Sequence, residues 1–519
     1  MEAKTYENIP KEKFQFAKKG DLSHDTKLDT KPVSYFHDAF RRFCKNKGAV
    51  VAAIIIIFLI LFALIAPFCT EYTVKYYDSQ FTTTAPKCKL FANTSFWDGC
   101  VEEETDYIYF IEKYAIGKET GHLVVKNNKY EITDEGLYKY RKDTYYSVGF
   151  GNYKTITESE YKSIQKYQNE TGRQVLYPTV RLKERPSVPF DRNANIYYKV
   201  KGNKTEPALD KDGELVLNYW TTTAGAGRYD DGYDSLRIEG DDGFTDENGK
   251  QTFYVYGRVV SGGYEVRAEY YEYYIYQHVV QEKDGITEPY FLFGTTAGGK
   301  DIFTCLASGA RFSFLFAIAV AAVNMFVGAI YGAVSGYYGG KIDLIMERIS
   351  DILNAVPFII VITLLKLNMG SASNILILFI AFFLTGWIGM ASTTRMQFYR
   401  YKNQEYVLAA RTLGASDKRL MFKHIFPNAL GTLVTSCALV IPSMIYSEVN
   451  LSYLGIINLE AGSITSVGTL ITAGQSCLSS APFVALFPSI FLALLMLSFN
   501  LFGNGLRDAF NPSLRGSEG

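Results

Sequence analysis

The sequence lacks several features that would place a protein in a well-defined functional class. Its formal net charge is zero, because 53 Lys and Arg residues balance 53 Asp and Glu residues, so nothing suggests nucleic-acid binding. Seven cysteines among 519 residues are too few for a disulfide scaffold. No nucleophile elbow, zinc-protease motif or ordered Ser/His/Asp set stands out. We therefore predict no catalytic residue and no cofactor bound by the chain itself.

An intact phosphate-binding loop is also missing. The segment GTTAGGKD (294–301) begins as such a loop does, with Gly294, four further residues, Gly299 and Lys300. The next position holds Asp301, where the Mg²⁺ chemistry requires a Ser or Thr hydroxyl, and no buried parallel strand is evident before it. We therefore reject nucleotide binding at this segment.

Metal ligation is not predicted either. The acidic segment RYDDGYDSLRIEGDDGFTDENGK (228–250) does not fit an EF-hand loop, and its Asp-Gly and Asn-Gly pairs favour tight turns over Ca²⁺ binding. His122 and His278 are isolated from each other and from any ligand spacing, which favours packed or surface roles. Cys88 and Cys100 could form a small-loop disulfide, a question that sequence alone leaves open.

The chain does contain long apolar runs, the first of them at residues 48–70. This run carries no charged residue, and about 20 apolar residues are enough to cross a bilayer, so we predict a transmembrane helix. A cleaved signal peptide is disfavoured because it would be shorter and nearer the start of the chain. The polar tail 1–47 precedes the helix. Its last residues include four cations that place this end in the cytoplasm: Arg41, Arg42, Lys45 and Lys47.

Five further apolar segments predict an α-helical polytopic membrane protein with six transmembrane helices. The second, fourth, fifth and sixth spans lie within 312–340, 367–394, 425–447 and 483–505. The third is the weakest, because only 352–365 is free of charge, and it reaches adequate length by starting near Glu347. Six spans return the C-terminus to the cytoplasm. The nearly uncharged, Gly- and Ser-rich segment 451–482 lies outside, as either a re-entrant cap or an ordinary loop.

Residues 71–289 contain no segment that could span a bilayer, so we expect an extracellular domain large enough for its own core. We predict an α+β or mostly β domain. Alternating runs at 252–260 and 264–280 flank Ser261-Gly262-Gly263, which predicts a hairpin, and a second is expected around Asn127-Asn128. Residues 158–169 have a helical pattern.

Three polar residues are predicted at or near membrane depth: Asn324, Asn354 and Glu448. Polar residues in transmembrane segments normally face a bundle interior or water. The sequence leaves two roles open for these residues: lining a transport pathway, or simple hydrogen bonding between helices.

A basic, soluble segment, EYVLAARTLGASDKRLMFKHIFPN (405–428), interrupts the apolar half of the chain. Its pattern predicts one helix over 404–413, with Tyr406, Ala409, Ala410 and Leu413 on a single face. Gly414 suits a left-handed C-cap, and a second helix is predicted over 418–426, capped by Ser416 or Asp417 and ending before Pro427. The second helix carries an apolar strip beside solvent-exposed basic side chains, as in a helix that docks into a groove.

The order of residues in this segment resembles the EAA loop of bacterial ABC importer permeases, through Glu405, Ala409-Ala410, Gly414, Ile425 and Pro427. The amino-acid sequence of this segment is most similar to that of the C-type permease of dipeptide and oligopeptide importers. Further matches are GARFSF (309–314), SGYYGGKIDLIMERISDIL (335–353) and EVNLSYLGI (448–456), so the resemblance covers about 294–512 and the first span. It implies the six-helix importer permease fold for the 290–519 core.

The resemblance also implies partners and a mechanism. The expected partners are a homologous second permease, two cytoplasmic ATPases that use ATP, an extracellular peptide-binding protein and the peptide, within the lipid of a bacterial plasma membrane. The EAA loop would dock the ATPases and move as a lever for alternating access. The residues assigned to that contact are Glu405, Ala409, Ala410, Arg411, Gly414, Asp417, Ile425 and Pro427.

The sequence departs from the family at three places. The family usually has a short loop where this chain has 71–289, and LEAGSITSVG follows LSYLG in place of a stretch with Pro and Trp. In the segment that resembles the family's GTD-x-x-GRD box, Thr296 replaces Asp and Lys300 replaces Arg. The departures bear on the substrate entrance, where 71–289 is either a platform for the binding protein or a shield.

Other functions remain as alternatives at this point. A membrane-tethered receptor or adhesin would use 71–289 as its working part, and an importer of nickel or another small solute would share the core. An ion-coupled carrier would show inverted repeats and intramembrane acids, but only Asp351 and Glu448 qualify, both near the ends of spans.

Overall fold

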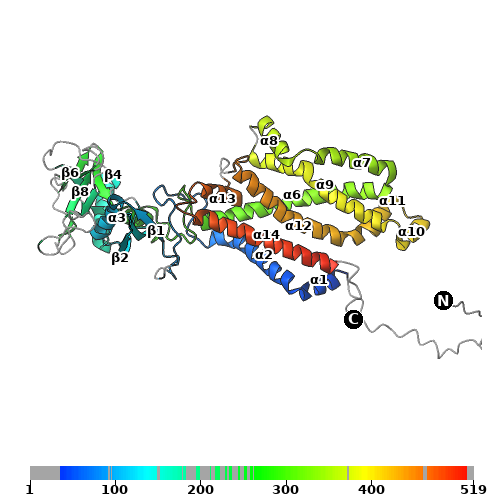
Figure 1. Ribbon diagram of the computed structural model, residues 1–519, viewed down its shortest axis with the longest axis horizontal. Helices are drawn as coiled ribbons and strands as arrows, with labels where there is room; N and C mark the ends of the chain where they lie inside the picture. The colour runs from blue at the N-terminus through cyan, green and yellow to red at the C-terminus, as the bar shows by residue number, and fades with distance from the viewer. Residues whose placement is uncertain are drawn as a thin grey trace, which may run out of the picture.

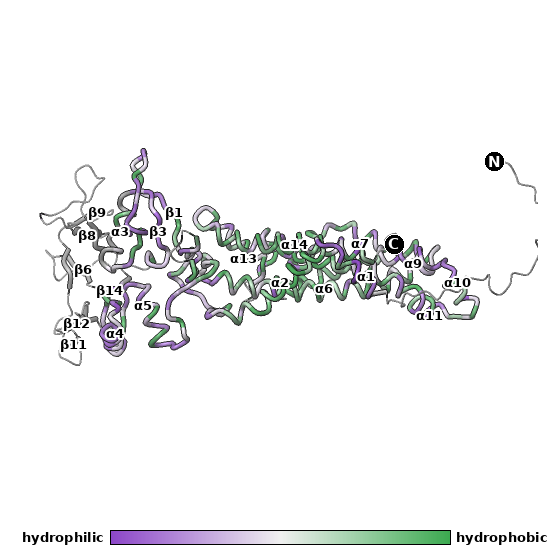
Figure 2. The backbone as a smooth tube through the Cα atoms, turned by 90° about the horizontal axis from the view of Figure 1, so that it is seen from below, coloured by the Kyte–Doolittle hydropathy of each residue, from purple (hydrophilic) through white to green (hydrophobic). Residues whose placement is uncertain are grey.

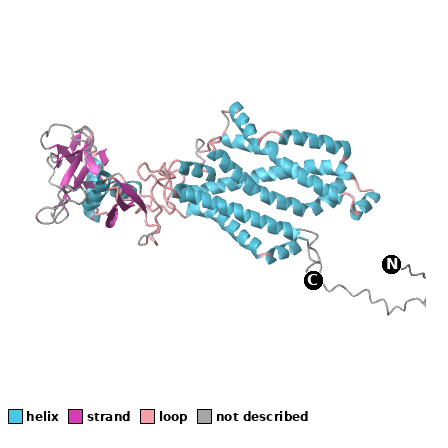
Figure 3. Ribbon diagram, in the orientation of Figure 1, coloured by secondary structure: helices cyan, strands magenta, loops and turns pink. Residues whose placement is uncertain are grey.

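The computed structural model describes residues 35–510 except for short gaps, at 92–93, 95, 149–151, 178, 183–194, 199–210, 212–216, 222–227, 231–232, 237–243, 246–250, 254–257, 261, 371–372 and 460–463. The molecule is elongated, with a bundle of helices at one end and a part containing strands and helices at the other (Figures 1 and 3). Figure 2 shows the apolar segments concentrated along the bundle, between more polar ends. The chain therefore has the form of a polytopic helical membrane protein.

Five helices of the described residues are long and apolar enough to cross a membrane. They begin with α2 (Lys47–Ile65), which follows α1 (Tyr35–Lys45) and continues into η2 (Ala66–Phe68), and include α6 (Ile302–Tyr338), α9 (Asn374–Tyr401), α12 (Phe426–Tyr453) and α14 (Phe483–Phe510). The predicted third span is a bent pair, α7 (Gly340–Asn354) and α8 (Phe358–Asn368), with an angle of 72° between them. Pro357 lies at the break, where it cannot continue the first helix.

The central helix α6 packs closely against α9 because small residues recur on one of its faces. A Cβ added at Gly332 would lie 2.2 Å from the carbonyl oxygen of Ala391, and Gly328 and Gly336 approach the α9 backbone in the same way. Small residues four apart let two helix backbones approach closely. In lipid this close packing drives helix association, because the hydrophobic effect does not act between helices there. Helices α2, α12 and α14 complete the bundle core around them.

The segment between the last two spans is folded rather than an ordinary loop. Helix α13 (Val467–Gln475) begins with a capping box, in which Ser466 and Thr469 each accept a hydrogen bond from the other's backbone N–H. Val467 and Leu470 are buried in the bundle core, against α6, α12 and α14. This helix therefore satisfies its own backbone and packs against protein, an arrangement compatible with the cap alternative.

The described part of 71–289 has the predicted mixture of helices and strands. One antiparallel sheet has the order β1-β3-β2 (Cys100–Thr105, Tyr138–Asp143, Val125–Ile132), with α3 (Tyr107–Thr120) against it. Another has the order β13-β14-β4 (Arg258–Val260, Gly263–Ala268, Asn152–Ile156), with β5 (Leu176–Tyr177) also on β14. Shorter pairings join β6 (Thr179–Leu182) to β10 (Tyr233–Leu236), β7 (Asn195–Tyr198) to β8 (Leu217–Thr221) and β9 (Arg228–Asp230), and β11 (Phe244–Thr245) to β12 (Gln251–Phe253).

One predicted hairpin is confirmed in part. Strands β13 and β14 pair antiparallel through a turn at Gly262 and Gly263, which have φ values of 96° and 150°. The strand predicted over 264–280 ends at Ala268, however, and the chain continues as α5 (Tyr270–Tyr276) and the π-helix η3 (Gln277–Glu282). Every residue of α5 is buried, so the aromatic-rich sequence is accommodated on all sides of a short helix and its alternation does not mark a strand.

The second predicted hairpin is wrong in position. Asn127 and Asn128 lie within β2, with φ values of 56° and 52°, and the register with β3 shifts there. Asn tolerates left-handed backbone, so the pair forms a bulge, and the chain reverses instead near Gly136 (φ 82°). The helix predicted over 158–169 is confirmed as α4 (Glu158–Thr171), N-capped by Thr157. The Asp-Gly and Asn-Gly pairs of 228–250 lie outside the described residues.

The first part of 71–289 pairs with 291–299, the segment that leads into α6. Backbone hydrogen bonds connect Asp78 N to Gly299 O (3.0 Å), Thr295 N to Thr84 O (3.0 Å) and Lys87 N to Phe291 O (2.9 Å). Gly299 has φ 69°, and an added Cβ would lie 1.7 Å from the Asp78 oxygen, so only glycine allows this approach. An aromatic core continues the junction, with Phe81, Tyr145, Tyr274 and Phe291 fully buried.

Asp301 ends this junction as the N-cap of α6, and its ionisation is expected to make stability depend on pH. Its carboxylate accepts hydrogen bonds from the backbone N–H and hydroxyl of Thr304 (2.8 and 2.6 Å). The uncharged run of α6 begins at Phe312, after Arg311, so Asp301 and the first turns of the helix precede the predicted apolar span. Burial raises the Asp301 pKa from 3.8 to about 6, against the lowering effect of these hydrogen bonds.

A carboxyl with a raised folded-state pKa adds stability that is complete below its unfolded pKa and lost as pH rises through the folded pKa. For Asp301 that window runs from 3.8 to about 6 and corresponds to about 3 kcal/mol. Asp301→Asn keeps the capping oxygen but cannot ionise. In detergent, we expect this variant to lose the fall in melting temperature that the wild type shows as the pH rises from 4 to 6. The exposed Glu71→Gln is the matched control, and parallel curves for wild type and Asp301→Asn would contradict the prediction.

Candidate functional site

The segment 405–428 lies at the end of the bundle far from the strands (Figure 1). It forms α10 (Glu405–Thr412), a turn, α11 (Asp417–Arg419) and the π-helix η4 (Leu420–Ile425), which leads into α12. Gly414 has φ 82° and Ser416 is the N-cap residue of α11, so the predicted left-handed stop and restart are confirmed. No side-chain cap hydrogen bond is formed at Ser416.

The prediction that the second helix ends before Pro427 is wrong. Residues Asp417–Tyr453 form one continuous helical stretch of 37 residues, with Pro427 in the first turn of α12. Proline cannot donate the next helical hydrogen bond and crowds the preceding turn. The π-helical turn of η4 immediately before it provides the wider spacing that accommodates the ring. The segment is therefore continuous with a helix that is long and apolar enough to cross a membrane.

An apolar core anchors the segment to the rest of the bundle. Val407, Leu420 and Ile425 are fully buried, and Met421 is nearly so. They pack against residues near the ends of α6 and α9, namely Ala333, Tyr337 and Phe398. The burial of this core fixes the orientation of α10 relative to the bundle.

The face of α10 that packs against the bundle differs from the apolar face predicted for the first helix. Of the predicted set, Ala410 is partly buried, while Tyr406 and Ala409 are exposed and Leu413 is 88% exposed. The packed face instead centres on Val407. We call the outward surface of α10 and its turn the docking face, formed by Glu405, Tyr406, Leu408, Ala409, Leu413 and Gly414.

Polar contacts secure the same segment. The Tyr337 hydroxyl donates to Asp417 Oδ1 at 2.6 Å and accepts from Arg411 Nη2 at 3.4 Å. The guanidinium of Arg411 also lies 5.8 Å from the Tyr337 ring centroid. Asp417 and Arg411 are exposed yet held by α6, so both of these predicted docking residues also position the segment.

The remaining predicted docking residues separate into two groups. Glu405, Ala409, Gly414 and Pro427 are exposed and available to another protein. Ile425 is fully buried and Ala410 is partly buried in the apolar core of the segment, so both support its fold, and Ile425 offers no contact surface.

A partly buried ion pair ties α7 to α9. Arg395 donates to Asp343 through Nε (2.6 Å) and Nη2 (2.7 Å) and contacts Glu347 at 2.5 Å. The Tyr399 and Ser335 hydroxyls also donate to Asp343. Fork-shaped pairing of this kind fixes geometry as well as charge. Sequence analysis did not single out this cluster, although a lone acid beside an apolar span, as in KID (341–343), is a usable signal.

The three predicted pathway residues are not brought together. Glu448 is 1% exposed and accepts hydrogen bonds from the hydroxyls of Ser466 (2.7 Å), Ser452 (3.1 Å) and Ser313 (3.3 Å), which belong to three different elements. Asn324 is buried between α6 and α9 and donates to the Phe382 carbonyl at 3.3 Å. Glu448 and Asn324 therefore both form hydrogen bonds to other elements, which is the alternative to lining a pathway.

Asn354 has different surroundings. It is exposed at the bend between α7 and α8 and lines a cavity of about 260 Å³ between α6, α7 and α9. Glu347, Asp351 and Arg395 line the same cavity. Among the three predicted residues, Asn354 therefore has the geometry most compatible with a polar pathway.

The cysteines and histidines of 71–289 can also be placed. Cys88 and Cys100 are free thiols, so the disulfide alternative is not formed in this structure. His122 pairs with Glu269 and Glu272, and His278 lies beside Glu282 and Asp284. Sequence analysis treated His278 as isolated, although the spacing of His278 and Glu282, four residues apart, places them on one face of a helix.

Comparison with known proteins identifies two matching families. Residues 325–516 match the binding-protein-dependent transport system inner membrane component, and residues 34–86 match the N-terminal TM domain of oligopeptide transport permease C. The matches leave 87–324 between them. The second match ends beside Lys87, where the chain pairs with Phe291, so 72–86 belongs with the family's core and the departure from the family begins near residue 87.

Curated relatives agree with these families. The chain is 43% identical over 223 residues to the oligopeptide transport system permease protein OppC of Bacillus subtilis (strain 168), covering 43% of this chain and 72% of that protein. It is 40% identical to OppC of Haemophilus influenzae, over 44% and 72% of the two chains. It is 39% identical to the dipeptide transport system permease protein DppC of Bacillus subtilis, over 43% and 69%.

The arrangement of apolar helices, the anchored segment 405–428 and these relatives agree with one another. The receptor and ion-coupled carrier alternatives explain neither the anchored segment 405–428 nor the two family matches. The chain belongs to the family of inner-membrane components of binding-protein-dependent transport systems, and it is a permease subunit of an ABC importer related to the oligopeptide and dipeptide permeases.

Proposed function

We propose that this chain forms one half of the translocation pathway of an importer for oligopeptides or dipeptides. The names of its relatives support peptides as the substrate class, ahead of nickel or another small solute. A homologous second permease would form the other half, an extracellular peptide-binding protein would deliver the peptide, and two cytoplasmic ATPases would consume ATP. The chain itself would perform no chemistry and would need no cofactor of its own for transport.

The observation that carries this proposal is the docking face. It exposes Leu413 (88%), Leu408 (42%) and Tyr406 (41%) on a short helix whose opposite side is firmly anchored. Exposed apolar residues grouped on a rigid element are typical of a protein contact. Because the docking face is joined through η4 to α12, closure of the ATPases would pull on a transmembrane helix and drive alternating access.

We further propose a six-span topology in which the bent pair α7 and α8 is one broken span. Both termini would then be cytoplasmic, together with the docking face, and 71–289 would be extracellular. The distribution of Lys and Arg supports this orientation, since Arg395, Arg400, Arg411 and Arg507 fall on one side. The position of the strands at the end opposite the docking face also supports it (Figure 1).

The topology is tested by proteolysis of intact cells or spheroplasts. Protease added from outside is expected to remove residues within 71–289 and to leave 395–425 protected until the membrane is permeabilised. Antibodies against the two segments would report the cleavage. Protection of 71–289 with loss of 395–425 would overturn the orientation.

Transport itself is tested with the assembled importer in proteoliposomes. Uptake of a labelled short peptide is expected to require ATP on the side of the docking face, the binding protein on the other side, and this chain. Competition by unlabelled peptide without competition by Ni²⁺ would support the peptide assignment. Competition by Ni²⁺ alone would replace it with the metal-importer alternative.

A further inference from the structure

Two histidines of the 71–289 region are each paired with two carboxylates, in different ways. His122 uses both ring nitrogens: Nδ1 lies 2.7 Å from Glu269 Oε1, and Nε2 lies 3.5 Å from Glu272 Oε1. Because a protonated imidazole has one N–H at each nitrogen, one carboxylate at each is a satisfied ion pair. The carboxylates raise the pKa of His122 against the lowering effect of burial.

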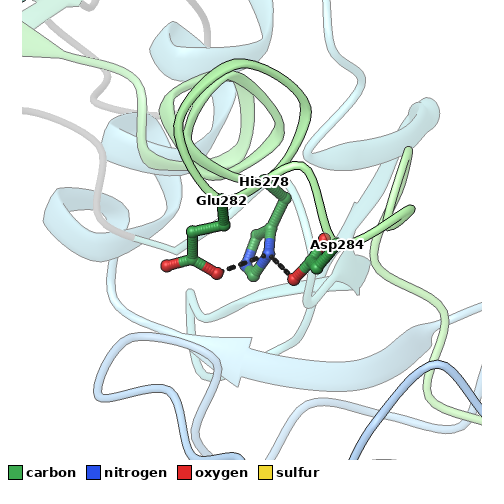
Figure 4. A group of neighbouring side chains, drawn as sticks. All are labelled: His278, Glu282 and Asp284. Atoms are coloured by element: carbon green, nitrogen blue, oxygen red, sulfur yellow. Dashed lines mark hydrogen bonds and ion pairs between the residues drawn. The ribbon is translucent and has the colours of Figure 1, made fainter.

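At His278 the two carboxylates meet at the same nitrogen. Nδ1 lies 2.6 Å from Asp284 Oδ2 and 3.2 Å from Glu282 Oε2, as Figure 4 shows. One nitrogen carries at most one proton, so a single N–H cannot be directed fully at both acceptors. Two anionic oxygens and one ring nitrogen therefore converge on a common point, where a cation would be shared by all three.

The ring of His278 is held in place before any ligand arrives. It is 7% exposed and lies against the ring of Tyr274, with centroids 4.1 Å apart. Tyr274 is itself fixed in the aromatic core, where its hydroxyl is hydrogen-bonded to that of Tyr76 at 2.9 Å. A ligand group whose orientation is set by packing loses little freedom on binding.

The two carboxylates are also positioned by the backbone. Glu282 follows His278 by four residues in η3, on the same side of the helix. Lys283 then adopts a left-handed conformation (φ 54°), which turns the chain so that Asp284 faces back toward the ring. Asp284 Oδ1 accepts a hydrogen bond from Ile286 N (3.0 Å), which leaves Oδ2 directed at His278.

We propose that His278, Glu282 and Asp284 form a binding site for a divalent transition-metal ion, of which Zn²⁺ is the best fit. Their donor atoms lie within 4.8 Å of one another. One imidazole nitrogen and two carboxylate oxygens suit Zn²⁺ better than Ca²⁺ or Mg²⁺, which prefer oxygen alone. The carboxylates are partly exposed, so water can complete the coordination.

The two spacings from the ring nitrogen need only a small adjustment, and the two carboxylate oxygens lie within 4.8 Å of each other. Zinc bonds of about 2.0–2.2 Å to nitrogen and oxygen place tetrahedral donors about 3.3 Å apart. The distance from Nδ1 to Glu282 is already 3.2 Å, and Asp284 would withdraw by about 0.7 Å from its 2.6 Å contact. The ion would then tie the end of η3 to the segment that returns to α6.

The site is tested with the full-length chain purified in detergent, its thiols alkylated so that the seven cysteines cannot bind the probe. Zn²⁺ titration followed by calorimetry is expected to show one ion per chain, and X-ray absorption should show nitrogen and oxygen ligands only. His278→Ala and Asp284→Asn should weaken binding at least about tenfold, since even indirect partners of a zinc ligand have effects of that size. Zn²⁺ should raise the melting temperature of wild type but not of these variants.

His122→Ala is the matched control, because it removes the histidine whose two nitrogens have separate carboxylates, and it should leave Zn²⁺ binding intact. Glu282→Gln changes an exposed side chain without altering its size, so its loss of affinity would not be attributable to misfolding. The proposal is overturned if wild type binds no stoichiometric Zn²⁺. It is equally overturned if His278→Ala and Glu282→Gln bind as wild type does.

Discussion

Gly414→Trp is expected to abolish ATP-driven uptake while leaving the chain at normal levels in the membrane. A Cβ added at Gly414 meets no other atom within 4 Å, so the indole would project from the docking face and not into the bundle. There it would occupy the space that an ATPase needs. Uptake of labelled peptide and copurification of the ATPases are both expected to fall to background.

The matched control is Gly414→Ala, which imposes the same left-handed backbone strain (φ 82°) without the bulk. That strain costs about 1–2 kcal/mol, too little to unfold the anchored segment, so near-normal coupling is expected. Glu405→Lys places the wrong charge at the start of α10, opposing the helix dipole, and should reduce coupling less severely than the Trp variant. Full uptake by both Gly414→Trp and Glu405→Lys would refute the docking assignment. Equal loss in the Ala and Trp variants would assign the effect to the turn itself.

The site shows where sequence periodicity is sufficient and where it is not. Gly414 could be predicted as a left-handed stop because few other residues adopt that backbone. The packed face of α10 could not, because eight residues make only two turns and both Val407 and Leu413 are apolar. Only the positions of α6 and α9 decide that Val407 is buried and Leu413 exposed. The Tyr337–Asp417 contact depends on the same tertiary arrangement.

The region between the first two spans shows a different limit. Its turn at Gly262-Gly263 and the helix capped by Thr157 follow from local chemistry and were predictable. Tyr270–Tyr276 was misassigned because tyrosine fits strands and buried helices alike, and the surrounding aromatic core favours the helix. Likewise, the convergence of Asp284 on His278 requires the left-handed turn at Lys283, a conformation that sequence gives little reason to expect.

Removing the strand-containing region while keeping the junction is expected to separate transport from ATPase binding. A deletion of 71–289 would also remove Asp78, Phe81 and Thr84, which pair with or pack against the segment leading into α6. A deletion of 88–289 keeps these three residues and the backbone hydrogen bonds of the junction, although it removes Tyr145 and Tyr274 from the aromatic core. The two ends lie close together, because Lys87 N and Phe291 O are hydrogen-bonded at 2.9 Å. A short Gly/Ser bridge from Lys87 to Tyr290 would therefore close as a hairpin.

The expected result of this deletion is a severalfold loss of uptake at low peptide concentration, with ATPase copurification unchanged. If the region receives the external binding protein, its double attachment beside the bundle gives even a weak contact a high effective concentration at the pathway mouth. Its many tyrosines suit such a contact, because tyrosine provides area with few rotamers to freeze. Saturating binding protein should then restore uptake, since mass action replaces the lost attachment. Unchanged uptake at low peptide concentration would instead assign the region to shielding, and loss of ATPase copurification would show that the junction depends on it for folding.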